Sequence, residues 1–309
     1  MIGGTSDSPL LAFELLRQMR DFVTIGDAAN RPDYKTGRGC VAYEYDLAKC
    51  QISNSDWCDF LNIIGEAAAI DRKLFHHDME KGVLGGLCRT SDAGMPFRAK
   101  PGWEKKPLVY VSYPSLLKYC NWCMTGKLDD GAYDLATMPP RRREGAIYFL
   151  PNADEWYKAA YWDPKKRCYY RYPTGSDAEP SVSEANFEKG DSLAVGKPFY
   201  FADVDDGSLA SSPFGVLQMG GNAWEFIENV WARSSGQYEN TLRGGSFGYT
   251  ETGLDKSNTD VCPYGGISYV FGARIAFAPL GWHSKPMPIR YKLILRARKC
   301  LATFARKFR

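Results

Sequence analysis

The chain has 309 residues, which is enough for one large domain or for two of ordinary size. Its composition, with 44% hydrophobic and 24% charged residues and a mean hydropathy of −0.37, excludes disordered, collagenous and integral membrane proteins. The net charge of +3 is uneven: residues 290–309 hold eight Lys or Arg and no acid, which leaves −5 on residues 1–289. A body of that charge argues against a nucleic-acid surface, so we expect no nucleic acid as partner.

The cysteines and the N-terminus lead us to expect a cytoplasmic protein. The nine cysteines have no repeated spacing, and residues 1–20 lack the basic and apolar regions of a signal peptide. Cys120 and Cys123 have the spacing of a redox or half-zinc motif, or of two small apolar residues in a helix. Because there is no second such pair and the chain has only three histidines, the helix interpretation is favoured.

Taken in chain order, the apolar patterns predict short elements joined by long loops. Apolar residues at helical spacing predict helices at residues 8–16, 53–64, 114–124 and 152–161. Runs of β-branched and aromatic residues predict strands at residues 22–25, 40–48, 109–113 and 146–150. Asn152, followed by Glu155, has the pattern of a capping box that opens the fourth helix.

Two stretches are predicted to be irregular. Residues 65–105 show no periodicity, and residues 164–212 combine turn-forming residues with many Tyr and Phe, so we expect long ordered loops. Trp156, Trp224 and Trp231 are expected in the core, in preference to a role in ligand stacking.

Five segments then resemble, in the same order, the motifs of one protein family. They read I-S-N-S-D-W-x-x-F-L-N (52–62), V-S-Y…Y-C-N-W (111–122), L-P-N-A-D-E-W (150–156), G-N-A-W-E-F (221–226) and R-G-G-S-F (243–247). Each resembles a motif of the formylglycine-generating enzyme (sulfatase-modifying factor) family, for example L-P-T-E-A-E-W and G-N-x-W-E-W.

The resemblance implies an α+β fold of the C-type-lectin type, with long loops and little regular secondary structure. It would form a single domain over residues 22–280. A helical extension at residues 1–21 and a basic tail at residues 281–309 would flank it.

The resemblance also locates where the family's oxidases hold copper with two cysteines. Those positions are Tyr249 and Leu254 here, and neither side chain is the soft thiolate that Cu(I) requires. The chain departs from the family again at residues 272–274, where G-A-R replaces G-F-R, and at Asn258, where relatives usually carry arginine. We therefore expect no copper and no copper-dependent formylglycine-generating activity, and we assign no catalytic residue.

The leading hypothesis is a pseudoenzyme-like protein that binds an unknown ligand or protein partner through residues 247–269. This segment is dense in Tyr, Ser, Thr, Asn, Asp and Gly, a composition typical of adaptable binding surfaces. The resemblance implies that the same segment is a hypervariable binding site in some relatives. The candidate ligand-binding residues are Ser246, Tyr249, Glu251, Asp255, Asn258 and Tyr264. Tyr249 suits a polar pocket and a remodelled surface loop equally well.

The alternative hypothesis is an oxidoreductase of the same family, a nonheme-iron or otherwise divergent oxidase acting on a sulfur-containing or other small substrate. One branch of the family holds iron with three histidines, and this chain has His76, His77 and His283. Adjacent histidines are expected to point to different faces of a helix or strand, so solvated loop histidines are favoured. A structural subunit of a cell-envelope assembly is a third hypothesis.

Structural calcium is the one cofactor that the resemblance implies. The oxygen donors that Ca²⁺ prefers would come from a first set, Gln218, Gly221, Ala223 and Glu225, and from a second set, Asn186, Phe187, Asp191 and Leu193. For the first set, the alternative is that Glu225 pairs within the core.

The basic tail predicts an amphipathic helix. On a helical period one stripe is apolar, and it contains Leu293, Ala297, Leu301, Phe304 and Phe308. Such a helix suits an anionic membrane surface at the inner face of the membrane, the protein's own acidic body, or a second subunit.

Overall fold

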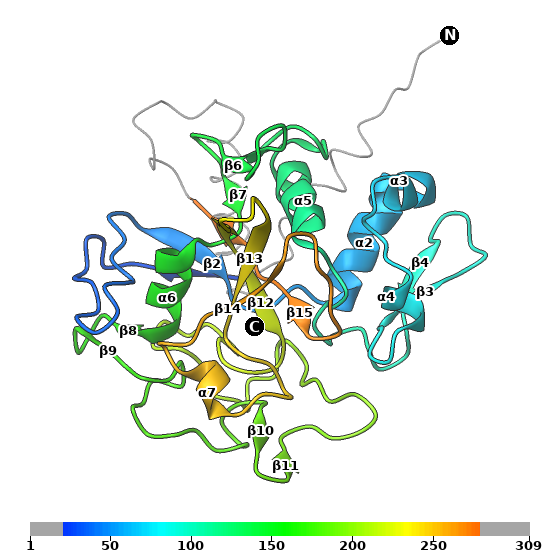
Figure 1. The fold of residues 1–309 in the computed structure, drawn as a ribbon. Coiled ribbons are helices and arrows are strands. Elements are labelled where there is room, and N and C mark those ends of the chain that lie inside the picture. The colour runs from blue at the N-terminus through cyan, green and yellow to red at the C-terminus, as the bar shows by residue number, and fades with distance from the viewer. Residues whose placement is uncertain (1–20, 279–309) are drawn as a thin grey trace, which may run out of the picture.

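The structure is a computed structural model that describes residues 21–278. The helix predicted at residues 8–16 and the basic tail lie outside the described residues. Within the described range the chain forms one α+β domain, with two four-stranded sheets, four two-stranded hairpins and helices around them (Figure 1). In this range we find no helix with the length and apolar character needed to cross a membrane.

The first sheet brings the two ends of the domain together. Its order is β1 (Phe22–Ile25), β2 (Tyr45–Ala48), β16 (Ala276–Phe277) and β7 (Tyr148–Phe149), and every pair in it is antiparallel. The strand predicted at residues 40–48 therefore exists only in its second half. Because β16 pairs with β2, the ends of the described chain are held in one sheet.

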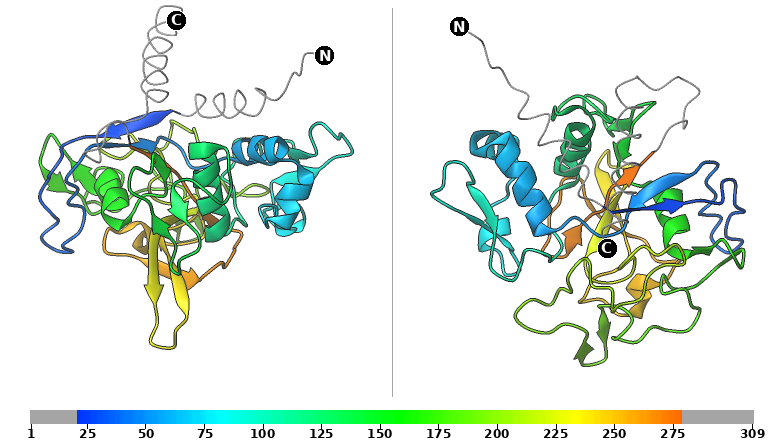
Figure 2. Two further views of the ribbon diagram at one scale, coloured as in Figure 1. Left: turned by 90° about the horizontal axis from the view of Figure 1, so that it is seen from above. Right: turned by 180° about the vertical axis from the view of Figure 1, so that it is seen from behind.

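The second sheet carries the family-like motifs near the C-terminus. Its order is β14 (Asp260–Pro263), β13 (Tyr238–Arg243), β12 (Trp224–Ala232) and β15 (Phe271–Gly272). The β12–β13 hairpin projects from the body (Figure 2). Trp231 lies near the end of this hairpin and is 52% exposed, so its predicted place in the core is wrong, whereas Trp156 and Trp224 are buried.

The predicted helices within the described range are confirmed. The helices are α2 (Asn54–Ile64), α3 (Glu66–Asp71), α4 (Asp78–Lys81), α5 (Tyr113–Thr125), α6 (Ala153–Tyr161) and α7 (Glu251–Leu254). Ser53 and Asn152 form capping boxes with residues three positions later, as the sequence predicts for Asn152. Cys120 and Cys123 are buried in α5 and belong to the core, which confirms the helix interpretation of this pair.

Residues 65–105 correct the prediction of a loop. They contain α3, α4 and the hairpin of β3 (Leu87–Arg89) and β4 (Phe97–Ala99), which are too short to leave a periodic signal. The strand predicted at residues 109–113 is absent because Tyr110 has a φ of 59° and Ser112 already caps α5. The remaining hairpins pair Tyr133–Asp134 with Arg141–Arg142 (β5, β6), Trp162–Asp163 with Cys168–Tyr169 (β8, β9) and Glu188–Lys189 with Ser192–Leu193 (β10, β11).

One main hydrophobic core connects the two sheets, with α5 packed on β7 and α6 packed on β12. A smaller cluster of Tyr172, Ala185, Phe187 and Leu254 includes the last residue of α7. The segment 247–269 is thus attached to the domain by α7 in this cluster and by β14 in the second sheet.

Candidate binding site

A buried ion pair lies where three of the motifs meet. β12 and β15 are parallel and pair Glu225 with Gly272, which places Arg274 two residues further on beside the carboxylate. Arg274 donates to Glu225 from Nη2 at 2.7 Å and from Nε at 2.8 Å, and both residues are at most 1% exposed. Trp156 donates its Nε1–H to the same carboxylate at 2.7 Å, and Gln51 donates at 3.0 Å. The pair is thus a saturated structural centre.

The hydrogen bonds of this centre involve two of the residues that were predicted to bind the first calcium ion. The Glu225 carboxylate accepts a guanidinium, and the Ala223 carbonyl accepts a hydrogen bond from Gln51 at 2.8 Å. A divalent cation would be repelled by Arg274 and would have to displace these donors. Gln218 Oε1 is buried without a hydrogen-bond partner, but one amide oxygen does not make a calcium site. The first set does not fit, and the pairing of Glu225 within the core is what the structure shows.

The second calcium set is divided between the interior and the surface. Asn186 is 1% exposed, and its Oδ1 is buried without a hydrogen-bond partner, so this oxygen suits a cation ligand. Phe187 is buried beside it, whereas Asp191 is exposed in the turn of the β10–β11 hairpin and Leu193 is exposed in β11. Calcium at Asn186 stays a prediction, with other oxygens than that of Asp191 needed to complete the site.

The two positions at which the resemblance places the family's copper ligands lie in different surroundings. Leu254 is fully buried in the small cluster at the end of α7. Tyr249 is 43% exposed, and its ring meets the buried Trp224 ring edge-on, with centroids 5.1 Å apart. An apolar side chain in the interior and a phenol at the surface make no soft metal site.

Buried charged side chains hold the backbone of the segment 247–269 in place. Arg243, at the end of β13, donates to the Lys256 carbonyl at 3.1 Å and to Thr259 Oγ1 at 2.7 Å. Lys256 in turn forms an ion pair of 2.7 Å with Asp33, and both residues are buried. Burial raises the pKa of Asp33, but hydrogen bonds from Lys256 and Tyr157 outweigh it and lower the pKa overall. The backbone of this segment is therefore held in place by the body of the domain.

The six candidate ligand-binding residues do not form one pocket. Ser246 is fully buried, Asp255 forms an ion pair with Arg171 at 2.6 Å, and Asn258 donates to the Thr252 carbonyl at 2.9 Å. Burial raises the pKa of Asp255, yet the hydrogen bond from Arg171 and those from Ser257 lower it overall. Asp255 and Asn258 thus support the segment, whereas the Ser246 hydroxyl is buried without a hydrogen-bond partner.

The other three candidates differ in how far they reach the surface. Tyr264 is half-buried and packs edge-on against Tyr113 at 5.8 Å. Tyr249 is 43% exposed, whereas Glu251 is half-buried like Asp255 and Asn258. Of the six candidates, Tyr249 is therefore the one that is most open to a ligand or partner.

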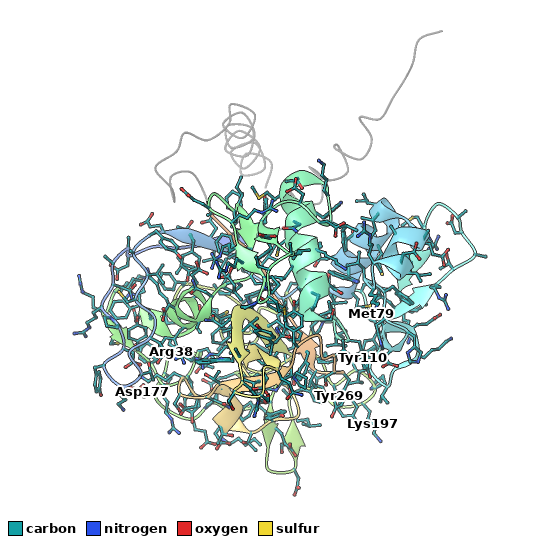
Figure 3. All side chains as sticks on the ribbon, turned by 45° about the horizontal axis from the view of Figure 1, so that its top comes forward. Arg38, Met79, Tyr110, Asp177, Lys197 and Tyr269 are labelled. Carbon is teal, nitrogen blue, oxygen red and sulfur yellow. The ribbon has the colours of Figure 1, made fainter. Side chains whose placement is uncertain are left out.

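Two further aromatic residues, which no motif in the sequence marks, lie near this surface. Tyr269 is 49% exposed. Burial raises the pKa of Tyr249, and Asp260 and Tyr269 add to this effect. Tyr110 is buried and donates its backbone N–H to the Ser268 carbonyl at 2.9 Å. In the view of Figure 3, Met79, Tyr110 and Tyr269 follow one another in a row, of which Tyr269 is the exposed member. Contacts between loops that are distant in the sequence bring these residues together, so no local sequence pattern predicts that they are neighbours.

A cavity of about 210 Å³ opens beside this row. It is lined by Lys73, His76, Met79, Tyr110, Ser112, Ser115, Gly265 and Ile267. Gly265 and Ile267 come from the segment 247–269. The other residues come from the chain between α3 and α4, from α4, and from the start of α5 with the residues just before it. The cavity thus joins the candidate segment to the chain around residue 76.

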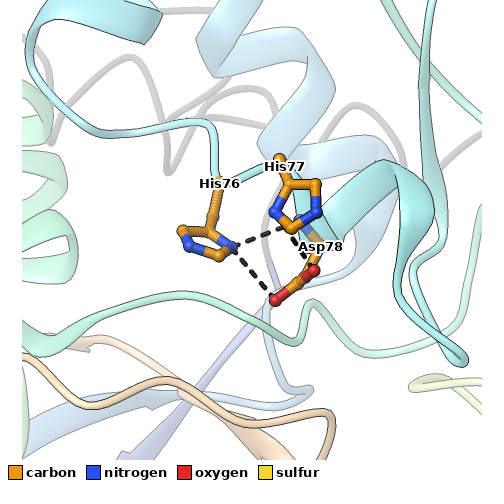
Figure 4. A group of neighbouring side chains, drawn as sticks. All are labelled: His76, His77 and Asp78. Carbon is orange, nitrogen blue, oxygen red and sulfur yellow. Dashed lines mark hydrogen bonds and ion pairs between the residues drawn. The ribbon is translucent and has the colours of Figure 1, made fainter.

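The expectation that His76 and His77 point to different faces is wrong. Both imidazoles lie next to the Asp78 carboxylate, with Nδ1 to oxygen distances of 3.5 Å for His76 and 3.2 Å for His77 (Figure 4). His76 precedes the short helix α4, and His77 already has helical dihedral angles (φ −59°, ψ −30°), so the backbone bends between them. The alternation of faces holds within a regular element and not across its boundary.

Comparisons with known proteins agree with this architecture. The family model of the sulfatase-modifying factor enzyme 1-like domain matches residues 23–279. The chain belongs to this family. A search of curated proteins finds no match. Among solved structures, CarF is similar with a TM-score of 0.59 and 17% identity, over 84% of this chain and 98% of that one.

Two further solved structures cover as much of the chain. The Treponema denticola variable protein 1 has a TM-score of 0.55 and 15% identity, over 84% of this chain and 95% of that one. PvdO from Pseudomonas aeruginosa has a TM-score of 0.44 and 16% identity, over 84% of this chain and 91% of that one. The family and the first two structures confirm the predicted α+β fold.

Proposed function

We propose that the protein is a binding module that holds a protein partner on the surface of the segment 247–269. The observation that carries the proposal is a group of large exposed side chains on an anchored backbone. Tyr249, Val261 and Tyr269 are 38–49% exposed, while Lys256 and Arg243 fix the chain beneath them. Exposed Tyr on a rigid support contributes contact area at small entropic cost, and Tyr is frequent among interface hot spots.

The alternative function, an oxidoreductase, requires a redox centre. The family's copper positions are Tyr249 and Leu254, which offer no thiolate, so the oxidase would depend on a different metal or on an unfamiliar set of residues. Metal analysis of the purified full-length protein separates the two functions. Stoichiometric iron or copper would contradict the binding module, and it would favour the oxidase.

The binding function is tested by partner capture with a matched control. The double variant Tyr249→Ala, Tyr269→Ala removes both exposed rings of the site. The control Tyr34→Ala removes a ring that is 88% exposed in the loop that follows β1. We expect proteins crosslinked to the wild type and to the control to be lost from the double variant. Equal capture by all three proteins would refute the proposal.

A further inference from the structure

The His76–His77–Asp78 cluster has the composition of a transition-metal site. One ligand atom from each of the three residues lies within 4.8 Å of the other two, and the imidazole rings are 5.4 Å apart at 60°. Two imidazoles and a carboxylate suit zinc and its first-row neighbours. The cluster is distinct from the Glu225 centre and from Tyr249 and Leu254, because it lies at the start of α4.

The distances between donor atoms fit a metal ion. Bonds of about 2.0–2.2 Å in a tetrahedral site place neighbouring donor atoms about 3.4 Å apart. The measured separations of Asp78 oxygens from His77 Nδ1 and His76 Nδ1 are 3.2 Å and 3.5 Å, on either side of this value. Small side-chain rotations bring the two imidazoles together, since His77 is largely exposed.

The backbone already holds the three residues in a turn. Met79 donates its N–H to the His76 carbonyl at 2.9 Å, and Lys81 donates to the His77 carbonyl at 2.9 Å. Met79 is buried and fixes the helix to the core. The Asp78 N–H donates to His76 Nδ1 at 3.2 Å, and a metal bound at this nitrogen would take the place of that hydrogen bond. Neutral imidazole is the form that binds metals.

The charge of the cluster also suits a cation. Within the described part of the chain, the ion-pair partners of Asp78 are these two histidines. No Lys or Arg among the described residues is recorded within ion-pair distance of Asp78, so the carboxylate's charge remains available to a metal.

We propose that His76, His77 and Asp78 hold a zinc ion beside the 210 Å³ cavity, which His76 lines. Three protein ligands leave at least one coordination position open. His76 lines the cavity together with Lys73, so a bound ion there meets a ligand that carries a carboxylate or another metal-coordinating anion. The site goes beyond the proposed partner surface and does not depend on it.

The test measures Zn²⁺ binding to the full-length protein by calorimetry after chelation, with excess Ca²⁺ present to occupy oxygen-only sites. We expect one Zn²⁺ per chain in the wild type. His77→Ala and Asp78→Asn should weaken it by at least about 10-fold, the smallest loss that even a supporting group of a metal site causes. Co²⁺ in place of Zn²⁺ should give visible absorption bands of a low-coordinate site that both variants lose.

Two controls keep the outcome specific to these residues. His283→Ala removes the third histidine of the chain, and Asp92→Asn removes an exposed carboxylate that pairs with Arg98 at 2.9 Å. Both should bind Zn²⁺ as the wild type does, and unchanged urea midpoints should show that all variants are folded. Absence of saturable binding, or equal binding by His77→Ala, or loss in His283→Ala alone would overturn the proposal.

Discussion

The centre around Glu225 and the segment 247–269 belong to the same sheet, but their side chains are under opposite constraints. In the centre, the carboxylate and the guanidinium of Arg274 are fully buried and hydrogen-bonded. In the segment, the backbone is held from below while Tyr249 and Tyr269 reach solvent. In this fold, therefore, the side chains that stabilise the domain are different from the exposed side chains that are available for binding.

The strongest way to break this comparison is to remove the guanidinium. Arg274→Ala leaves the Glu225 carboxylate buried without its counter-charge, so we expect a loss of about 3–5 kcal/mol in the free energy of unfolding. Arg233→Ala is the control, because its ion pair with Glu239 involves an arginine side chain that is 58% exposed, and its loss should change the free energy of unfolding far less. Urea unfolding measures both, and similar losses would show that the centre is not special.

The second prediction concerns the effect of calcium at Asn186 on the stability of the fold. If Asn186 Oδ1 takes a cation, Ca²⁺ at 100 times its dissociation constant stabilises the fold by about 2.7 kcal/mol. We expect a chelator to lower the unfolding temperature of the wild type and to leave that of Asn186→Ala unchanged. Asp191→Asn is the control and should keep the calcium effect, because Asp191 is exposed in the hairpin turn. A wild type that is insensitive to Ca²⁺ would end the calcium prediction.

The motifs predict the buried half of the molecule better than the exposed half. The Asn152 capping box, α2 and α5 follow from short-range rules of helix starts and apolar spacing, and the structure confirms them. The pairing of Glu225 with Arg274 joins residues 49 positions apart, and only the parallel register of β12 and β15 brings them together.

Several features of the candidate site could not be predicted from the sequence. Asp255 and Asn258 have the polar character of ligand-binding residues, but in the fold they form an ion pair and a hydrogen bond within the domain. Tyr110 and Tyr269 meet through a contact between loops, and His76 and His77 converge because the chain bends before a helix of four residues. Contacts of this kind depend on the path of the whole chain, which periodicity and capping rules do not describe.

The smallest expected effect is the most informative, because it compares two aromatic residues two positions apart. Phe247 is 8% exposed and its ring meets Phe201 edge-on at 5.0 Å, so Phe247→Ala should cost about 3–5 kcal/mol of unfolding free energy. Tyr249 is 43% exposed, and Tyr249→Ala should change that free energy by about 0.5 kcal/mol or less while it weakens partner capture. Urea unfolding and crosslinking on the same preparations give both values. A large stability loss in Tyr249→Ala would mean that the fold needs the edge-on contact of this ring with Trp224. The surface of the segment could then not vary independently of the fold.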